Sequence, residues 1–229
     1  LDDGKIHLKI VEKAENMAEN GGENTQGKRY FAKVLWGGLL KSRKSAALPG
    51  AKIYPPTLTN SDLANIKIAK EMGVTGVMQP FVRDHSDLEC VKEALREAGA
   101  EDIRLFAKIE NMDGVRKLEK LLPAADEIVI ARGDLGNAVH LWDLPGVQRQ
   151  ISEKCRAAGK PFMVVTQMLA SMERSPVPTR AEVNDIFHAV MDGAASIMVT
   201  GETAVGDYPV EVIRYMVNTV RSAEKKENR

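Results

Sequence analysis

The feature of this sequence that most constrains its fold is a regular alternation of short apolar runs with longer amphipathic segments from about residue 57 onward. Each apolar run has the length of a strand, and a segment with helical periodicity follows it. The runs lie at residues 74–81, 103–110, 127–131, 161–166 and 195–200. This alternation predicts an α/β fold with about five parallel β/α units, in which a helix connects each strand to the next.

Residue types at the ends of the amphipathic segments predict where several helices begin. Asn60 or Ser61 is the expected N-cap of the helix that precedes the first strand. Thr179 and Glu182 have the spacing of a capping box at the start of a later helix. Residues 113–122 are expected to form one continuous helix.

The polar residues that follow the apolar runs help to distinguish an open doubly wound sheet from a closed barrel. Several different runs end in polar side chains, namely Lys108, Glu110, Arg132, Asp134, Thr166, Gln167, Thr200, Glu202 and Thr203. A doubly wound sheet would concentrate its signal in one glycine-rich first turn, and the sequence contains no GxGxxG. Polar residues at many strand ends are typical of a TIM (β/α)8 barrel. We therefore predict a partial TIM barrel, with about three further strands expected before residue 1.

The first 45 residues have a different pattern. They contain two short β-rich runs, KIHLKIV and YFAKVLW, separated by the polar stretch ENGGENTQGKR. This pattern is typical of a small β structure. We therefore expect residues 1–45 to be a β remnant with a linker and residues 46–229 to be an incomplete barrel. Because the sequence starts with LDDGKI and lacks an initial methionine, we expect a piece of a longer protein.

The composition argues against several classes of function. Lys plus Arg and Asp plus Glu both total 32, so the formal net charge is zero. Such a balance indicates no general affinity for nucleic acid or for an anionic membrane. No apolar run approaches the roughly 18 residues that a membrane span needs. The two cysteines form no CxxC pair, which argues against zinc and favours a reducing, cytoplasmic location.

Glu110 and Asp134 are the candidate metal ligands. They follow adjacent strands of the predicted sheet, and carboxylate oxygens that leave other positions to water and substrate suit Mg²⁺ or Mn²⁺. Lys108 lies two residues before Glu110, so both side chains point to the same side of the strand. Together they could neutralise the charge of a phosphate or an enolate. The alternatives are a simple ion pair inside the barrel and, for each acid, a helix cap.

The stretch ARGDLG, residues 131–136, is a candidate ligand-binding turn, with an ordinary tight turn as the alternative. Gly133 allows close approach of the backbone, and amide groups at a helix start can bind a carboxylate or a phosphate. Thr166 offers a hydroxyl at the next strand end, where a threonine bonded to the backbone is the alternative. Lys44, in the basic segment SRK, belongs either to a solvated linker or to a site for nucleotide phosphates.

Four segments closely resemble the pyruvate kinase family: AKIENMDGVRKL, IVIARGDLG, AGKPFMVVTQMLASMERSPVPTRAEVNDIFHAVMDGA and IMVTGETAVGDYPVEVI. The similarity is dense from about residue 101 to 216. The N-terminal residues resemble more loosely the late part of that family's inserted β lid domain. The resemblance implies a TIM barrel and the last step of glycolysis, transfer of a phosphoryl group from phosphoenolpyruvate to ADP to give pyruvate and ATP.

The resemblance also implies a role for each charged residue of the candidate site. Lys108 resembles the lysine that steadies the transferring phosphoryl group, and Glu110 and Asp134 resemble the ligands of Mg²⁺ or Mn²⁺. The ligands of a K⁺ ion are expected in the part of the family's barrel that precedes residue 1. A homo-oligomer, usually a tetramer, is the assembly typical of the family.

Further site residues follow from the same resemblance. Gly133, Asp134 and Thr166 match positions that contact the substrate, and Thr166 would also act catalytically, in the relay that protonates the enolate. Lys44 matches a lysine that contacts the nucleotide.

Two other functions stay open from the residues alone. A non-catalytic relative would keep the metal ligands and act as a binding or assembly module. A Mg²⁺-dependent lyase acting on pyruvate enolates would also place carboxylates at neighbouring strand ends, but it would not need ADP. We expect the isolated chain to be inactive, because five barrel strands alone leave sheet edges unpaired.

Overall fold

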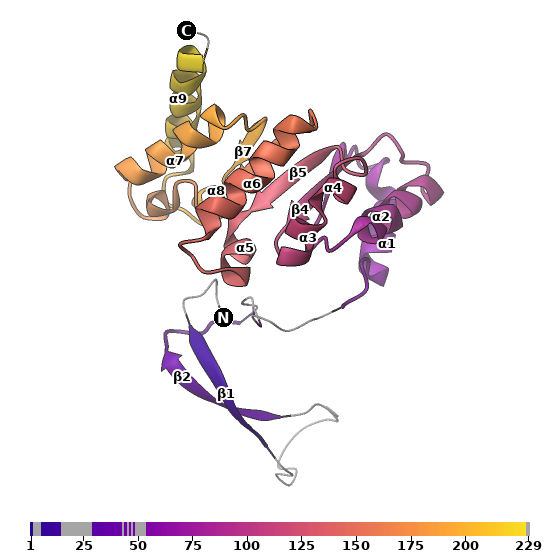
Figure 1. The fold of residues 1–229 in the computed structure, drawn as a ribbon, viewed down its shortest axis with the longest axis horizontal. Coiled ribbons are helices and arrows are strands. Elements are labelled where there is room, and N and C mark those ends of the chain that lie inside the picture. The colour runs from indigo at the N-terminus through magenta and orange to yellow at the C-terminus, as the bar shows by residue number, and fades with distance from the viewer. Residues whose placement is uncertain are drawn as a thin grey trace. The chain divides into compact units, whose positions relative to one another are not determined.

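The computed structural model describes residues 1, 6–14, 29–42, 44, 46, 48 and 54–227. The chain divides into two compact units, Leu1–Gly50 and Ala51–Arg229 (Figure 1). The assignment of the N-terminal residues to a lid domain stays a prediction.

The N-terminal unit contains an antiparallel hairpin, formed by β1 (His7–Lys13) and β2 (Tyr30–Trp36). The His7 ring stacks on the Trp36 ring with a centroid separation of 4.1 Å. Side chains along both strands are exposed. The small β structure expected near the N-terminus is thus confirmed.

The second unit is built on a parallel sheet that has five strands in the described part of the chain. In spatial order, which is also chain order, they are β3 (Gly76–Gln79), β4 (Arg104–Ile109), β5 (Glu127–Ala131), β6 (Phe162–Val165) and β7 (Ser196–Met198). Right-handed connections that always advance to the next strand place the connecting helices on one face of the sheet. A doubly wound sheet would instead reverse its strand order at a switch point. The topology therefore confirms the α/β fold and agrees with a partial barrel.

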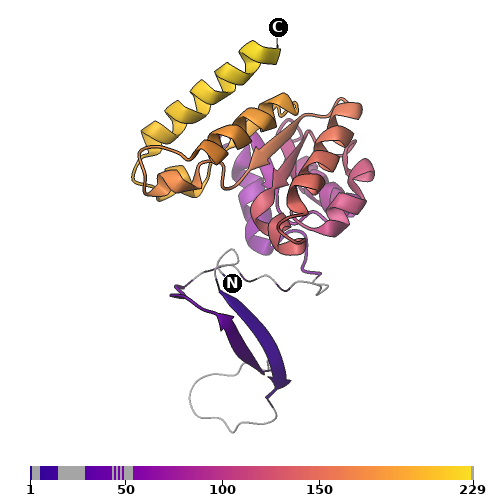
Figure 2. The same ribbon diagram turned by 60° about the vertical axis from the view of Figure 1, so that its left-hand side comes forward.

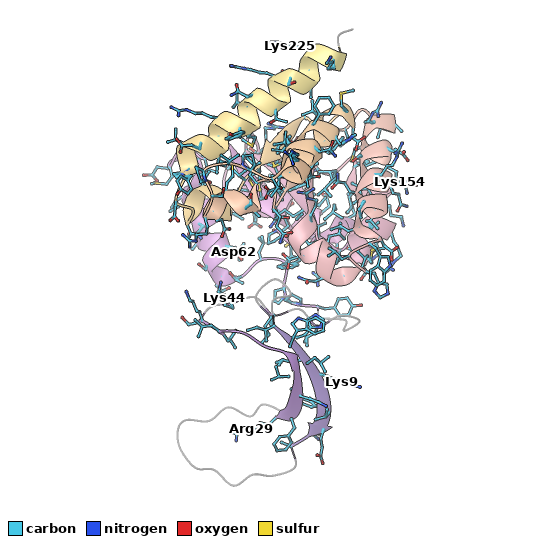
Figure 3. All side chains as sticks on the ribbon, turned by 90° about the vertical axis from the view of Figure 1, so that its left-hand side faces the viewer. Lys9, Arg29, Lys44, Asp62, Lys154 and Lys225 are labelled. Atoms are coloured by element: carbon cyan, nitrogen blue, oxygen red, sulfur yellow. The ribbon has the colours of Figure 1, made fainter. Side chains whose placement is uncertain are left out.

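The helical segments of this unit pack beside the sheet (Figures 1 and 2). They are α1 (Asn60–Ala69), α2 (His85–Glu97), α3 (Met112–Arg116), α4 (Leu118–Leu121), α5 (Arg132–Ala138), α6 (Leu144–Ala157), the 3-10 turn η1 (Ala170–Glu173), α7 (Arg180–Met191), α8 (Gly201–Ala204) and α9 (Pro209–Glu227). Lys154 on α6 donates a 2.8 Å hydrogen bond to Glu119 on α4, which ties two neighbouring helices at the surface (Figure 3).

The two faces of the sheet are packed differently. Alternate strand residues such as Leu105, Ile109 and Ile130 belong to the main core and are fully buried. The opposite face carries a small separate cluster that includes Val129 and Val165. One face thus packs on the helices, and the other carries a separate, smaller apolar cluster.

Two helix boundaries differ from the sequence expectations, and a third agrees with them. Thr59, not Asn60 or Ser61, caps α1, because its hydroxyl and the carboxylate of Asp62 form a reciprocal capping box. The expected helix over 113–122 is divided into α3 and α4, because Lys117 leaves the helical conformation. The capping box of Thr179 and Glu182 is confirmed at the start of α7.

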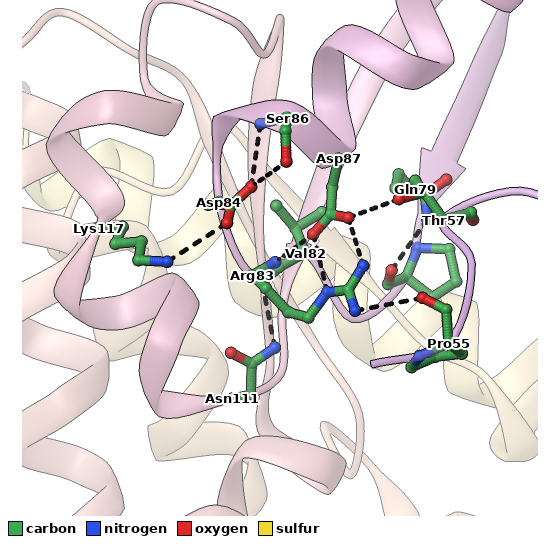
Figure 4. Close-up of polar contacts among 11 residues, drawn as sticks. Pro55, Thr57, Gln79, Val82, Arg83, Asp84, Ser86, Asp87, Asn111 and Lys117 are labelled. Carbon is green, nitrogen blue, oxygen red and sulfur yellow. Dashed lines mark hydrogen bonds and ion pairs between the residues drawn. The ribbon is translucent and has the colours of Figure 1, made fainter. Parts of the chain in front are cut away.

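A polar cluster fixes the start of α2 (Figure 4). The Arg83 guanidinium contacts the Asp87 carboxylate at 2.6 Å, and the Thr57 hydroxyl donates to the same carboxylate, also at 2.6 Å. Burial raises the pKa of Asp87, but the hydrogen bonds from Arg83 and Thr57 outweigh it and hold the pKa at about 2. Asp84 caps α2 and contacts Lys117 at 3.3 Å. These contacts explain the local fold and leave the charges of this cluster paired.

Candidate functional site

The carboxyl ends of β4, β5 and β6 lie at the same edge of the sheet. Ile109 is paired with Ile130, and Ala131 with Val165, along the parallel ladders. The residues that follow these strands, Glu110, Arg132 and Thr166, therefore begin three neighbouring segments, of which the one after β5 is the helix α5. The sheet register thus brings together the strand-end residues that the sequence separates by tens of positions.

Lys108 and Glu110 form a close ion pair at this edge. Nζ of Lys108 lies 2.7 Å from Oε1 of Glu110. The Glu110 side chain is 1% exposed, whereas the Lys108 side chain is 25% exposed. The lysine therefore stabilises a buried carboxylate while part of its side chain remains accessible from the inner face of the sheet. The ion pair that the sequence left open as an alternative is present.

The second carboxylate oxygen of Glu110 accepts a hydrogen bond from the backbone N–H of Phe81, 2.7 Å away. Phe81 has a positive φ of 53°, an unusual conformation for a residue with a side chain. The loop after β3 is thereby fastened to the end of β4. A carboxylate has about four lone-pair directions, so two protein contacts leave capacity for a further ligand.

Asp134 lies in the first turn of α5, which begins directly after β5. Its side chain is half-buried. Among the described residues, no group of three or more His, Cys, Asp or Glu could hold a metal ion. Two carboxylates from adjacent strands nevertheless suit a hard cation that keeps water and substrate oxygens as its other ligands. The donor set fits Mg²⁺ or Mn²⁺ on chemical grounds, and metal binding by Glu110 and Asp134 stays a prediction.

Thr166 and Gly133 join the loop after β6 to the first turn of α5. The backbone N–H of Gly133 donates to Oγ1 of Thr166 over 2.8 Å. The threonine is thus bonded to the backbone, the alternative that the sequence left open. The same contact engages the amide that the sequence offered for an anion. Whether Gly133 and Thr166 contact a substrate stays a prediction.

The backbone of Thr166 is strained. Thr166 has a φ of 76° and Gln167 a φ of 52°, so two consecutive residues with side chains adopt the left-handed conformation. This conformation is a genuine outlier for a β-branched residue and costs on the order of 1–3 kcal/mol. Strain of this kind persists only where surrounding contacts enforce it.

Arg132 contacts the backbone at this strained residue. Its NH1 lies 2.8 and 2.6 Å from the two carboxylate oxygens of Asp185 on α7, and its NH2 donates to the Thr166 carbonyl at 2.8 Å. The Arg132 side chain is only 12% exposed. Asp185 was not identified from the sequence, where nothing distinguishes it from any other polar residue of an amphipathic helix.

Two further carboxylates hold the loop that follows β6. Glu202, buried at the start of α8, accepts from the backbone N–H groups of Leu169 and Thr200 at 3.2 and 2.8 Å. Glu182 of α7 accepts from the hydroxyl of Ser171 at 2.6 Å. Burial raises the pKa of Glu182, but the hydrogen bonds from Ser171 and Thr179 outweigh it and hold the pKa below its usual value. The sequence placed Glu202 at a strand end but gave it no role.

Lys44 lies in the N-terminal unit, whereas the parallel sheet lies in the second unit. Its expected contact with a nucleotide stays a prediction. In the described part of the chain, no helix is both long and apolar enough to cross a membrane.

Comparison with known proteins gives a consistent result. The family model of the pyruvate kinase barrel domain matches residues 1–213. Pyruvate kinase from Bacillus licheniformis is 38% identical over 228 residues, which cover 100% of this chain and 37% of that protein. The enzyme from Geobacillus stearothermophilus is 39% identical over 216 residues, covering 94% of this chain and 35% of that protein.

A eukaryotic relative shows a similar level of identity. Pyruvate kinase from Dictyostelium discoideum is 41% identical over 189 residues, 82% of this chain and 37% of that protein. The chain thus spans little more than a third of the length of these relatives.

Proposed function

Because this chain belongs to the pyruvate kinase family, we propose that the full-length gene product transfers the phosphoryl group of phosphoenolpyruvate to ADP. The bond between phosphorus and the enol oxygen breaks, and a new bond forms between phosphorus and a β-phosphate oxygen of ADP. The products are ATP and the enolate of pyruvate, which takes up one proton at C-3. The overall reaction is the last step of glycolysis.

The observation that carries this proposal is the gathering of Lys108, Glu110, Gly133 and Thr166 at the ends of three neighbouring parallel strands. Active sites of TIM barrels lie at this end of the strands. A cation, a buried carboxylate and a hydroxyl at one edge are groups that suit phosphoryl transfer and enolate protonation.

Each residue of this chain has a defined task in the proposal. The Lys108 ammonium offsets the charge that develops on the transferring phosphoryl group, since catalysis of this reaction rests on positioning and electrostatics. Glu110 holds Lys108 in place through the 2.7 Å ion pair. Gly133 and Asp134 contact the substrate. The Thr166 hydroxyl hands a proton toward the enolate, and its oxygen stays fixed by the Gly133 amide.

Glu110 and Asp134 would hold the divalent cation, Mg²⁺ or Mn²⁺. When bound, this cation supplies charge neutralisation for the phosphoryl group and the enolate. Lys44 would contact the nucleotide. A K⁺ ion, a homotetramer and a cytoplasmic location belong to the same proposal, as properties of the full-length gene product.

The decisive experiment follows pyruvate release from phosphoenolpyruvate by the full-length gene product with Mg²⁺, in the presence and absence of ADP. We expect strictly ADP-dependent release that is lost in Lys108→Ala. The half-buried Lys154 on α6, which pairs with Glu119, provides the matched control, and Lys154→Ala is expected to retain full activity.

Other outcomes would support the alternatives. A folded protein that releases no pyruvate would contradict the proposal and favour a non-catalytic relative. Release that is independent of ADP would also contradict it and would favour hydrolysis or enolate chemistry. Turnover by residues 1–229 alone would contradict our expectation that the isolated chain is inactive.

A further inference from the structure

The loop after β6 adopts a conformation that its own sequence does not favour. Thr166 and Gln167 both have positive φ angles, 76° and 52°, and neither is a glycine. A threonine released from outside contacts would return to negative φ. The position of its hydroxyl therefore depends on whatever holds the backbone at this residue.

Arg132 is the group placed to hold that backbone. Its NH2 donates to the Thr166 carbonyl at 2.8 Å, while its NH1 lies within 2.8 Å of both carboxylate oxygens of Asp185. The guanidinium is planar and its donors form a rigid fork, so both contacts are satisfied by one fixed orientation. A lysine has a single nitrogen on a flexible stem and does not reproduce this geometry.

We propose that Arg132 and Asp185 are a positioning pair for the reaction. They hold the backbone of Thr166 in its strained conformation, so that its hydroxyl remains hydrogen-bonded to the Gly133 amide. This inference rests on the proposed function. Arg132 contacts no reacting atom of the proposed reaction and acts only through Thr166. Asp185 acts one step further away, by fixing the orientation of the guanidinium.

The fixed position of the Thr166 hydroxyl has a chemical consequence. Oγ1 of Thr166 accepts a hydrogen bond from Gly133, and none of the described residues accepts the hydroxyl hydrogen. Acceptance of a hydrogen bond polarises a hydroxyl and strengthens it as a donor. The contacts of Arg132 and Asp185 therefore orient the polarised hydroxyl of Thr166 at the end of β6. Loss of these contacts would impair protonation of the enolate more than binding of phosphoenolpyruvate, and so would lower kcat more than it changes KM.

A double-mutant cycle in the full-length gene product tests the pair. Arg132→Met is expected to lower kcat by about 100-fold, because misplacement of a catalytic group by about 1 Å has that effect. Thr166→Val removes the hydroxyl itself and is also expected to lower kcat by about 100-fold. KM for phosphoenolpyruvate is expected to change less than about threefold. The double variant is expected to be no slower than the slower single variant, because both substitutions remove the same arrangement. If the two losses multiply instead, Arg132 acts independently of Thr166 and the proposal is wrong.

Asp185→Asn provides a milder test in case Arg132→Met does not fold. It keeps the shape of the side chain but removes the charge, so we expect a smaller fall in kcat, of about tenfold. The control is Arg149→Met on α6, which removes an exposed arginine paired with Glu153 and is expected to leave kcat unchanged. An unchanged kcat in Asp185→Asn would overturn its part in the pair.

Crystal structures provide a readout that does not depend on activity. In Arg132→Met we expect the φ of Thr166 to become negative and the Gly133 N to Thr166 Oγ1 hydrogen bond to break. Retention of both features would overturn the proposal. If the unsubstituted protein releases no pyruvate, the proposed function fails, and the crystal structures still decide whether Arg132 positions Thr166.

Discussion

The backbone N–H of Gly133 donates a 2.8 Å hydrogen bond to Oγ1 of Thr166, joining the segments that follow two neighbouring strands. The contact links a glycine in the first turn of α5 to a threonine whose φ is 76°. The Thr166 hydroxyl therefore has a stabilising role, as acceptor of this hydrogen bond, besides its proposed catalytic role. Its two roles can be separated by substitutions that keep or remove the oxygen.

We expect Thr166→Val to destabilise the protein by about 1–2 kcal/mol, because it leaves the Gly133 amide without its acceptor. It should also lower kcat strongly, as stated above. Thr166→Ser keeps the oxygen and should retain kcat to within about tenfold. Urea unfolding and steady-state kinetics measure the two effects. A Thr166→Val protein with full kcat would contradict a role for the hydroxyl in the reaction.

Removal of Lys108 should affect both stability and activity. Lys108→Met leaves the carboxylate of Glu110, 1% exposed, without its cation. Breaking a buried pair in this way costs about 3–5 kcal/mol, and the partial exposure of Lys108 places the expected loss at about 2–3 kcal/mol. In the double variant Lys108→Met with Glu110→Gln, stability should largely recover but activity should not. Recovery of activity in the double variant would contradict the task proposed for Lys108.

Metal binding can be tested without turnover. We expect Glu110→Gln and Asp134→Asn each to weaken Mn²⁺ binding by at least about tenfold, since each removes a charged ligand. Titration calorimetry measures the affinity directly. Asp62→Asn is the matched control. The carboxylate of Asp62, labelled in Figure 3, accepts a hydrogen bond in the capping box of α1. Equal Mn²⁺ affinity in all four proteins, the unsubstituted one included, would exclude Glu110 and Asp134 as ligands.

Stability should fall in acid because of Asp87. Its pKa is about 2 in the folded protein, below the usual value of 3.8, so the folded state favours the ionised form. The resulting stabilisation, about 1–2 kcal/mol, is fully present above about pH 5 and is lost as the pH falls from about 4 toward 2. Urea midpoints measured between pH 6 and pH 3 should decline less in Asp87→Asn. An equally steep decline in that variant would assign the effect to other groups.

Substitution by alanine should change the stability of the protein in opposite directions at two glycines, Gly206 and Gly146. A Cβ at Gly206 would lie 2.3 Å from the Glu202 carbonyl oxygen, a backbone atom that cannot move aside easily. We therefore expect Gly206→Ala to cost about 1–3 kcal/mol. Gly146 lies in α6 and has nothing within 4 Å of an added Cβ. Gly146→Ala should stabilise the protein by about 0.5–1 kcal/mol. Urea unfolding of both variants gives the comparison, and a loss of stability in Gly146→Ala would contradict it.

The sequence predicted the order and type of most elements because they depend on local periodicity. The apolar runs at 103–110 and 127–131 became β4 and β5, and the Thr179 capping box begins α7. The division of 113–122 was not predicted. The break at Lys117 accompanies the burial of both Leu118 and Leu121, and that packing involves residues far away in the chain.

The sequence by itself determined which residues stand at the strand ends, since that follows from where each apolar run stops. Only the tertiary structure decided what those residues do to one another. Arg132 and Asp185 are 53 positions apart, and Glu110 and the Phe81 amide are 29 apart. No local pattern encodes either contact, because each arises from the register of parallel strands and from the packing of a helix against them. The strained backbone of Thr166 is likewise a product of its surroundings, since its own residue type disfavours that conformation.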